Sequence, residues 1–212
     1  NGSSWLGKDI KATFGRLGMG LSVAVMVSIF LGIGMGCFDI IEAFFLKILS
    51  FLSKIPPTAA IPVFFVLPNI VGLNGDSEII YIGMISFGIF PTLSQAIHQA
   101  VRNDISINSI YKTRTLGASI PEVIWNHIFK QVLPKIIENT RLSIGPALVY
   151  LLAAEYALAE VGFGYRLRMQ SRLLNMSVVF WYLMLLGMIG WALDFVAVKI
   201  RQYLCPWFDG EN

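Results

Sequence analysis

The sequence has 212 residues, 56% of them hydrophobic and only 14% charged, and its formal net charge is +3. This composition lies outside the range of ordinary soluble domains and predicts an integral membrane protein. Because most of the basic residues flank apolar stretches, the positive charge indicates little about nucleic acid and more about orientation in a membrane.

Apolar stretches long enough to cross a bilayer recur along the chain. A hydrocarbon core of about 30 Å needs roughly 20 apolar residues in a helix. Four uncharged stretches reach this length, at 17–38, 55–75, 79–101 and 173–193, and a fifth, 142–159, is interrupted only by a glutamate. We therefore predict an all-α fold with about five spanning helices. A membrane barrel is excluded, because the apolar runs are continuous rather than alternating.

The start of the chain carries two features that precede the first predicted span. Residues 5–16 set basic side chains around Trp5, a pattern typical of an interfacial lead-in at the level of the lipid headgroups. The chain begins with Asn1 and lacks the charged and apolar regions of a signal peptide. We therefore expect that an N-terminal piece precedes this sequence.

Two helices are predicted between residues 17 and 53. The first is a span at about 17–37, in which Gly32 and Gly36 lie on one helical face and permit the close approach of another helix. The second, residues 38–53, sets charged side chains among Ile, Phe and Leu. It is too short and too charged to span comfortably, and it predicts an amphipathic helix along the interface.

The second predicted span contains four prolines: Pro56, Pro57, Pro62 and Pro68. The first two suit the start of a helix, whereas Pro62 and Pro68 remove backbone donors inside it and predict kinks. Broken helices are tolerated in membranes where they line a cavity or pack on neighbouring helices. This span is therefore expected to be irregular.

Two polar side chains in the next spans are candidates for function. His98 ends the third span, about 79–98, where an interfacial position is the ordinary explanation and a proton or ligand site is the alternative. Glu155 lies inside the fourth span, about 136–158. A carboxylate in a span is expensive to bury and usually faces protein or water, so Glu155 has either a functional or a structural packing role.

A connection with glycines and three arginines joins the fourth span to the fifth, which covers about 174–195. The arginines are Arg166, Arg168 and Arg172. They could favour an anion or an acidic protein surface, and solvated arginines are the ordinary alternative.

Residues 113–134, TRTLGASIPEVIWNHIFKQVLP, are polar between two apolar spans, yet they carry an amphipathic helical pattern. The apolar residues at helical spacing are Leu116, Ile120, Val123, Ile124 and Ile128. Gly117 can end one helix in a left-handed conformation, and Ser119 and Glu122 fit a capping box that begins the next, with Pro121 in its first turn. We predict two short helices joined at an angle around Gly117.

Two short helices between spans can dock in a groove of a soluble partner through their apolar stripe. An amphipathic hairpin on the lipid surface is the alternative. A DNA-reading helix-turn-helix is disfavoured, because the segment is tethered between spans and has no dense basic face. Placing this segment in the cytoplasm also puts more of the Lys and Arg residues on the cytoplasmic side, as the positive-inside rule requires.

The sequence contains no recognisable catalytic constellation. Its two histidines are His98 and His127, and it has no HExxH, GxSxG or GxxxxGK[ST] motif. Its two cysteines, Cys37 and Cys205, lack the spacing of a metal site or a disulfide framework, and we interpret them as small apolar residues. If transport consumes energy, a partner is expected to consume it.

Four segments carry a resemblance to a known family. The stretch TRTLGASIPEVIWNHIFKQVLPKIIENTRLSIG resembles the cytoplasmic EAA loop of ABC importer permeases, the transmembrane subunits of binding-protein-dependent uptake systems. IPPTAAIPVFFVL is similar to an IPPxAxIP stretch, LLAAEYALAEVGFGY to an AAE and GxG stretch, and GMIGWALDFVAVKI to the last helix. In this order they resemble the nitrate, sulfonate, taurine and bicarbonate subgroup over nearly the whole chain.

The chain departs from the family pattern within the loop. Tyr111, Lys112 and Thr113 stand where the family often carries Glu-Ala-Ala, and Phe129 and Lys130 stand in place of a Leu-Pro pair. A second Leu-Pro pair of this subgroup is matched by Leu133 and Pro134. These differences put the usual acidic contact with the ATPase in doubt.

The resemblance implies an all-α type I ABC importer transmembrane bundle. Residues 1–212 would form a single permease domain without its N-terminal helix, and residues 106–131 would form the cytoplasmic coupling segment. The implied partners are ABC ATPase subunits, a second permease copy in a homodimer, a solute-binding protein and the lipid bilayer, with no nucleic acid. No cofactor is expected on this chain, because ATP and Mg would bind the ATPase. The implied location is a bacterial-type inner membrane.

Particular residues match the positions that the family uses. Those implied for coupling to the ATPase are Leu116, Gly117, Ala118, Ser119, Ile120, Glu122, Ile124, Leu133 and Pro134. Those implied to shape or flank the translocation route are Pro56, Pro57, Pro62 and Glu155. The implied function is that of a non-enzymatic permease for a small, anionic solute that alternates between inward-open and outward-open states.

Two other classes of function stay open from the residues. A channel or ion-coupled secondary carrier could use Glu155 together with His98, and a membrane enzyme could hold an unrecognised site. The sequence also leaves open which solute is carried and whether the two permease copies are identical.

Overall fold

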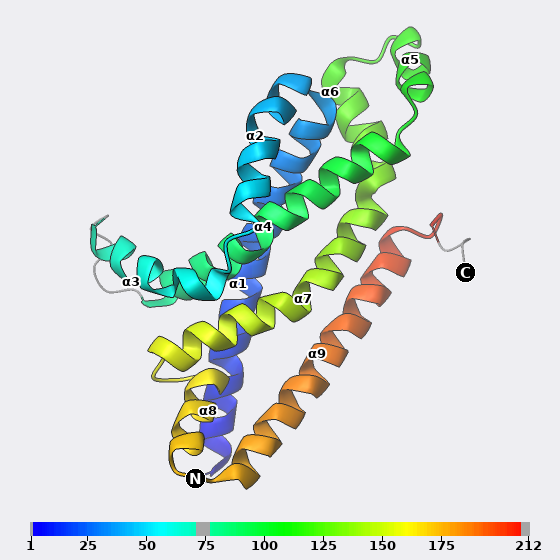
Figure 1. Ribbon diagram of the computed structural model, residues 1–212. Helices are drawn as coiled ribbons and strands as arrows, with labels where there is room; N and C mark the ends of the chain where they lie inside the picture. Colours follow the sequence, from blue (N-terminus) through cyan, green and yellow to red (C-terminus); the bar gives the residue numbers. More distant parts are fainter. Residues whose placement is uncertain (1, 71–76, 209–212) are drawn as a thin grey trace. The chain divides into compact units, whose positions relative to one another are not determined.

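The computed structural model describes residues 2–70 and 77–208, and every regular element in these ranges is a helix (Figure 1). In chain order the elements are α1 (Gly2–Cys37), α2 (Asp39–Leu52), the 3-10 helix η1 (Pro57–Ala60), α3 (Ile61–Ile70), α4 (Ser77–Asp104), α5 (Ile107–Thr115), α6 (Ile120–Glu122), the π-helix η2 (Val123–Phe129), α7 (Lys130–Leu158), α8 (Phe163–Arg172) and α9 (Met176–Leu204). The all-α prediction is confirmed.

Within residues 2–70 and 77–208, three helices are long and apolar enough to cross a membrane, at Trp5–Cys37, Glu78–Asp104 and Met176–Leu204. Two bent pairs raise the number to five if each pair is one span. The first pair joins α2 to η1 and α3 with a bend of 84°. The second pair joins the helical run Ile120–Leu158, whose last part is α7, to α8 with a bend of 55°. The predicted count of five agrees with this upper number. The second span differs from the prediction, because α2, expected as a separate interfacial helix at 38–53, supplies its first half.

The sharp break in the first bent pair lies earlier than the prolines predicted. α2 ends at Leu52 and η1 begins at Pro57, so the 84° bend falls between them. Pro62 lies one residue inside α3, which is helical from Ile61 onward. Pro57 removes a backbone donor that the first turn of a helix does not use, which explains why a new helix begins there.

The residues build two compact units, each of which is described by itself. Unit 1 contains the described parts of Asn1–Ala24, Ile55–Ile89 and Ile144–Asp194. Unit 2 contains those of Val25–Lys54, Phe90–Ser143 and Phe195–Asn212. Four helices, α1, α4, α7 and α9, cross the boundary between the units. Each of them therefore contributes one segment to unit 1 and one to unit 2.

The core of unit 1 is apolar and is built from α1, α4, α7 and α8. Tyr81, Met84, Ile85, Leu151 and Phe163 are almost completely buried in it. The ring of Phe163 meets that of Tyr182 edge to face, with centroids 5.4 Å apart. Within a bilayer, close van der Waals packing of such side chains favours helix association.

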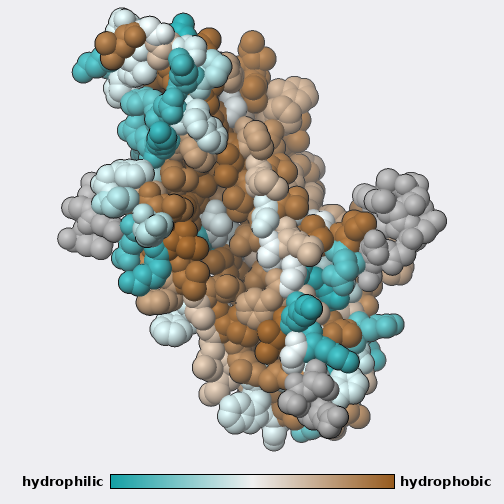
Figure 2. Space-filling view, turned by 180° about the vertical axis from the view of Figure 1, so that it is seen from behind, coloured by the Kyte–Doolittle hydropathy of each residue, from teal (hydrophilic) through white to brown (hydrophobic). Residues whose placement is uncertain are grey.

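Large hydrophobic side chains also remain exposed, and brown surface covers much of the face in Figure 2. Along the first part of α9 the exposed ones are Phe180, Trp181, Met184, Met188 and Trp191. A soluble monomer rarely exposes so many large apolar residues on one helix. This exposure fits a helix that meets lipid or another subunit.

In unit 2, α1 and α4 pack at the close distance that glycine permits. A Cβ atom added to Gly32 would lie 2.7 Å from the Cβ of Ile97, and one added to Gly36 would lie 2.5 Å from the Cβ of Val101. Both distances are too short for real carbon atoms. The prediction that Gly32 and Gly36 allow close helix approach is confirmed.

Replacing Gly36 by Ala is expected to destabilise the protein by about 1–3 kcal/mol, because the added methyl group forces α1 and α4 apart. Gly34→Ala is a matched control on the same helix, since its Cβ would lie 3.7 Å from the nearest atom, Cδ1 of Ile41. Thermal unfolding in detergent should show a lower midpoint for Gly36→Ala and no loss for Gly34→Ala. Equal losses in both variants would contradict the close-packing explanation.

Candidate functional site

A tight turn ends α5 at Gly117, as the sequence predicts. The φ of Gly117 is +91°, in the region that favours glycine. The Gly117 N–H donates to the carbonyl oxygen of Arg114 at 3.0 Å, and the Ala118 N–H donates to that of Thr113 at 3.4 Å. These two bonds form a Schellman motif, which satisfies the last carbonyls of a helix. The direction of the chain is therefore fixed by hydrogen bonds at this turn.

A capping box then begins α6. The Ser119 N–H and the Ser119 hydroxyl both donate to Oε2 of Glu122, each at 2.8 Å. Donation from the Ser119 backbone and side chain lowers the pKa of the Glu122 carboxyl in this segment, which precedes the fourth predicted span. The predicted capping box is confirmed. Local hydrogen bonds therefore end α5 and begin α6.

Replacing Glu122 by Ala is expected to loosen the start of α6, because the Ser119 N–H loses its acceptor. Amide hydrogen exchange, followed by mass spectrometry, should become several-fold faster in residues 119–123. Glu160→Ala is the control, since Glu160 is also an exposed glutamate and lies outside this segment. Unchanged exchange in Glu122→Ala would show that the capping box contributes nothing to local order.

The second helix of the segment differs from the prediction of a separate short helix. α6 continues through the π-helix η2 into α7, so residues 120–158 form one helical run. Val123 and Ile128, five residues apart, are both buried, which fits the i to i+5 spacing of a π-helix. The predicted stripe therefore divides: Val123 and Ile128 face the interior of unit 2, while Leu116 and Ile120 stay exposed.

Side chains also connect α5 to η2. Oγ of Ser109 lies 2.9 Å from Nε2 of His127, within hydrogen-bond distance. The ring of Trp125 stacks on that of Phe129, with centroids 4.8 Å apart. The contact of Ser109 with His127, together with the two caps, holds α5 against η2.

The predicted coupling residues occupy different environments within unit 2. Leu116, Gly117, Ser119, Ile120 and Glu122 are exposed, Ala118, Ile124 and Leu133 are half-buried, and Pro134 is buried. The exposed fractions of Leu116 and Ile120 are 88% and 52%. The turn around Gly117 thus presents two apolar side chains outward, and we call residues 116–120 the apex. A role of these nine residues in coupling stays a prediction.

A buried polar cluster surrounds Glu155 in unit 1. Its carboxylate is completely buried and accepts hydrogen bonds from Oγ1 of Thr13 at 2.9 Å and from the Gly164 N–H at 3.0 Å. Nη1 of Arg16 donates to the same group at 2.9 Å. Gly162 has a φ of +127°, and a Cβ there would lie 2.6 Å from the carboxyl carbon. The chain therefore closes tightly over this carboxylate.

Arg16 joins four parts of unit 1. Besides Glu155, its Nη1 donates to the carbonyl oxygen of Val161 at 2.8 Å. Its Nε and Nη2 donate to the two carboxylate oxygens of Glu78 at 2.8 and 2.7 Å. The guanidinium carbon lies 4.1 Å from the centroid of the Tyr81 ring. A fork of this kind binds a carboxylate in one fixed orientation.

Asp9, on the same helix, holds the connection between α7 and α8. Its buried carboxylate accepts from the Gly162 N–H at 3.1 Å, from Nε of Arg166 at 2.9 Å and from the Tyr182 hydroxyl at 3.3 Å. In Figure 1, α8 lies beside the first part of α1, in agreement with these bonds. Residues 5–16 are therefore part of α1, which begins before the predicted first span.

The polar face of α1 went unrecognised in the sequence. Asp9, Thr13 and Arg16 are spaced by four and three residues, which places them on one side of a helix. That spacing was a usable signal, but it gives no information about the partner. We call Asp9, Thr13, Arg16, Glu78 and Glu155 the Arg16 cluster.

The three arginines predicted between the fourth and fifth spans lie in α8, and two of them bind other parts of the chain. Arg166 binds Asp9, and Arg168 donates to the carbonyl oxygens of Ala157 and Ala159, both at 2.8 Å. Arg172 is exposed. Because Arg166 and Arg168 bind groups of the chain itself, the structure favours neither of the two earlier explanations for them, solvated side chains or an anion site.

The proline-containing segment packs against α4 in unit 1. A Cβ added to Gly88 would lie 2.5 Å from the ring of Tyr150 and 2.9 Å from Cγ of Pro57. Pro57 is half-buried there, whereas Pro56 and Pro62 are exposed. Whether these prolines and Glu155 flank a translocation route stays a prediction.

The remaining polar candidate, His98, lies in unit 2. Its Nε2 is 3.2 Å from Oε1 of Glu42, and Glu42 also pairs with Arg102. Among residues 2–70 and 77–208, no group of three or more His, Cys, Asp or Glu side chains could hold a metal ion. The expectation that ATP and Mg bind only a partner is untested.

Comparisons with known proteins identify the class to which this fold belongs. A chain from a structure of inward-facing conformations of the MetNI methionine ABC transporter superposes on this chain with a TM-score of 0.76. The match covers 95% of either chain, with 17% sequence identity. The fold is therefore that of the transmembrane domain of a type I ABC importer.

The sequence matches a family described as binding-protein-dependent transport system inner membrane component over residues 24–209. The chain belongs to this family. Two relatives agree with the predicted subgroup. The taurine transport system permease protein TauC of Escherichia coli is 25% identical over 95% of this chain and 71% of its own length. The nitrate import permease protein NrtB of Synechocystis sp. is 27% identical over 95% and 70%.

Proposed function

We propose that this ABC importer permease carries a small anionic solute inward and is driven by a separate ATPase subunit. The names of the two relatives supply the solute class, since nitrate is an anion and taurine carries a sulfonate group. The chain would contribute no catalysis of its own, and ATP and Mg would bind the ATPase. Its location would be a bacterial-type inner membrane, in a pair with a second permease copy and in contact with a solute-binding protein.

The apex is the observation that carries this proposal. Leu116 and Ile120 project from a turn that a Schellman motif and a capping box hold on both sides. Apolar side chains on a rigid, exposed turn suit a groove on a soluble partner, and their order lowers the entropy lost on docking. The Arg16 cluster and the close packing of α1 on α4 stiffen the helices that such a partner would move.

In the proposed cycle, ATP binding and solute delivery act through their different affinities for inward-open and outward-open states. The ATPase would bind the apex more tightly in one of the two states. Because the apex is continuous with α7 through η2, a displacement of the apex would be transmitted along a single helical run.

The experiment is co-purification of an ATPase subunit, followed by ATP-dependent uptake in proteoliposomes. Leu116→Asp is expected to reduce ATPase binding strongly, because it places a charge in the apolar contact. Leu173→Asp is the matched control, since Leu173 is also an exposed leucine and lies at the end of α8. Solute uptake driven by a proton gradient without ATP would contradict the proposal.

The environment of Glu155 does not favour the alternative of an ion-coupled carrier. Its carboxylate is enclosed by donors from Thr13, Arg16 and Gly164, and its exposed fraction is 0%. A group that loads and releases an ion needs access to water from both sides in turn. The geometry instead supports a structural role for Glu155.

A further inference from the structure

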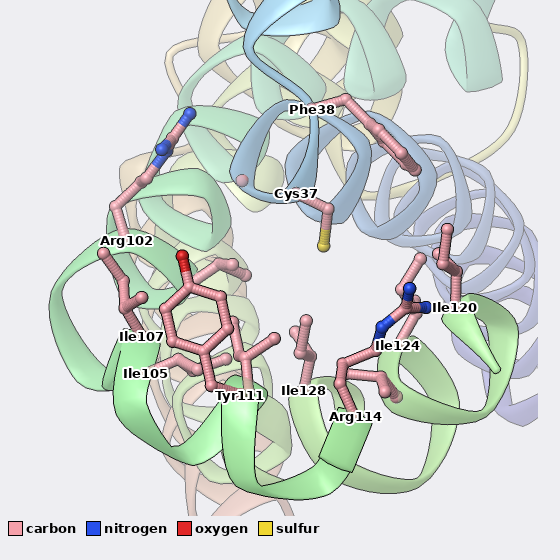
Figure 3. Close-up of a pocket in the computed structure, with 14 residues that line it drawn as sticks. Cys37, Phe38, Arg102, Ile105, Ile107, Tyr111, Arg114, Ile120, Ile124 and Ile128 are labelled. Carbon is pink, nitrogen blue, oxygen red and sulfur yellow. The ribbon is translucent and has the colours of Figure 1, made fainter. Parts of the chain in front are cut away.

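Unit 2 contains a cavity behind the apex, and Ile120 of the apex forms part of its lining. It lies among the end of α1, the end of α4, and the helices α5, α6 and η2, and its volume is about 390 Å³. Six of its fourteen lining residues are isoleucine. Figure 3 shows the sulfur of Cys37 directed into it and the ring of Tyr111 along its side. We call it the arginine cavity, because Arg102 and Arg114 are its two charged lining residues.

The charge of this cavity is unbalanced. Arg102 pairs with Asp39 and Glu42, so its charge is compensated by α2. Arg114 is exposed, and no carboxylate of residues 2–70 or 77–208 forms an ion pair with it. Lys112 lies nearby on α5, which contains no acidic residue. A ligand that enters the cavity therefore meets an apolar wall and one uncompensated guanidinium group.

A second, almost purely apolar cavity of about 410 Å³ adjoins the first. The two share Cys37, Phe38 and Ile124 as lining residues. The second extends along α1 past Phe30, and Trp125 forms part of its edge. We call it the chain cavity. It offers room for a hydrocarbon chain beside the positively charged end.

The position of both cavities fits the boundary of a bilayer. The candidate spans Trp5–Cys37 and Glu78–Asp104 end at the residues around the arginine cavity. An exposed tryptophan such as Trp125, stacked on Phe129, is typical of the lipid headgroup level. Basic pockets between spanning helices at this level bind the phosphates of lipid headgroups.

We propose that the two cavities together bind one anionic glycerophospholipid. Its phosphate lies against Arg114, and one of its acyl chains fills the chain cavity along α1. The bound lipid thereby connects α1 and α4 to α5 and η2, the helices that carry the apex. This inference does not depend on ATP-driven import, since it concerns binding to the chain itself.

Native mass spectrometry of the purified, delipidated full chain tests the proposal. Phosphatidylglycerol is expected to bind in preference to phosphatidylcholine with identical acyl chains. Arg114→Gln should weaken phosphatidylglycerol binding about fivefold and leave phosphatidylcholine binding unchanged. Arg172→Gln, at an exposed arginine of α8, is the matched control and should change neither. Equal binding of the two lipids, or equal effects of the two substitutions, would overturn the proposal.

Thiol labelling gives a second measurement that does not depend on a charge substitution. On a Cys205→Ser background, Cys37 is the single cysteine and lies in the wall shared by the cavities. Phosphatidylglycerol is expected to slow its reaction with a maleimide several-fold, and phosphatidylcholine is not. Protection by inorganic phosphate alone would show a simple anion site, and protection by a co-purified protein would show that a subunit covers the cavity. Either result would overturn the lipid assignment.

Discussion

Replacing Arg16 by Met is expected to destabilise the protein by about 3–5 kcal/mol, because the change leaves the Glu155 carboxylate buried without its cation. The exposed fraction of Glu155 is 0%, so water cannot take the place of the guanidinium group without opening the packing. The midpoint of thermal unfolding in detergent should fall by roughly 6–20 °C for a chain of this size. This is the largest change in stability that we expect from a single substitution.

Two further variants separate a buried ion pair from general loss of packing. Glu78→Gln removes the other carboxylate bound to Arg16. Because the side chain of Glu78 is 53% exposed, this change is expected to have a much smaller effect on stability. The double variant Arg16→Met with Glu155→Leu should be more stable than Arg16→Met alone, since it no longer buries an unpaired charge. If the double variant is less stable than Arg16→Met, the buried pair is not the source of the loss.

Local signals in the sequence predicted local structure well. The turn at Gly117 and the capping box of Ser119 and Glu122 depend on residues within five positions of one another. Hydrogen bonds of this range form in the same way in many folds, so composition and spacing identify them. The helix contact through Gly32 and Gly36 was predictable for a related reason, because two small residues four apart always share a face.

The Arg16 cluster could not be predicted in the same way. Arg16 and Glu155 are 139 positions apart, and only packing brings α1 to α7 and α8. The cost of burying a carboxylate indicated that Glu155 needs a partner, but several arginines were equally available in the sequence. Asp9 and Thr13 read as interfacial residues because the helix that continues them into the first span was not recognised.

Periodicity was also misleading at η2. A stripe at 3.6-residue spacing placed Val123 and Ile128 on the same outward face as Leu116 and Ile120. The π-helical turn instead directs Val123 and Ile128 into unit 2, where their exposed fractions are 3% and 4%. Since a π-helix adds a residue to each turn, it shifts the register of everything that follows. The apex is therefore smaller than the predicted docking surface.

Replacing Gly117 by Val is expected to lower ATP-driven uptake by roughly 5–30-fold while leaving insertion and thermal stability unchanged. A residue with a side chain loses about 1–2 kcal/mol in the left-handed conformation, and a β-branched one loses more. Gly117 has a φ of +91°, and no atom lies within 4 Å of its hypothetical Cβ. The penalty is therefore conformational, and it lowers the fraction of molecules in which the turn has the shape that docks. Uptake and solute-stimulated ATP hydrolysis in proteoliposomes measure it.

Gly117→Ala and Gly145→Ala form a matched pair that isolates this conformational penalty. Both positions have open space for a methyl group, but Gly145 lies inside α7 with ordinary helical geometry. Because Ala favours a helix over Gly by about 1 kcal/mol, Gly145→Ala should keep full coupling and equal or exceed wild-type stability. Gly117→Ala should lose coupling, though less than Gly117→Val. Wild-type uptake and ATP hydrolysis in Gly117→Val would show that the turn tolerates another backbone conformation, and the apex would then have no role that depends on its rigidity.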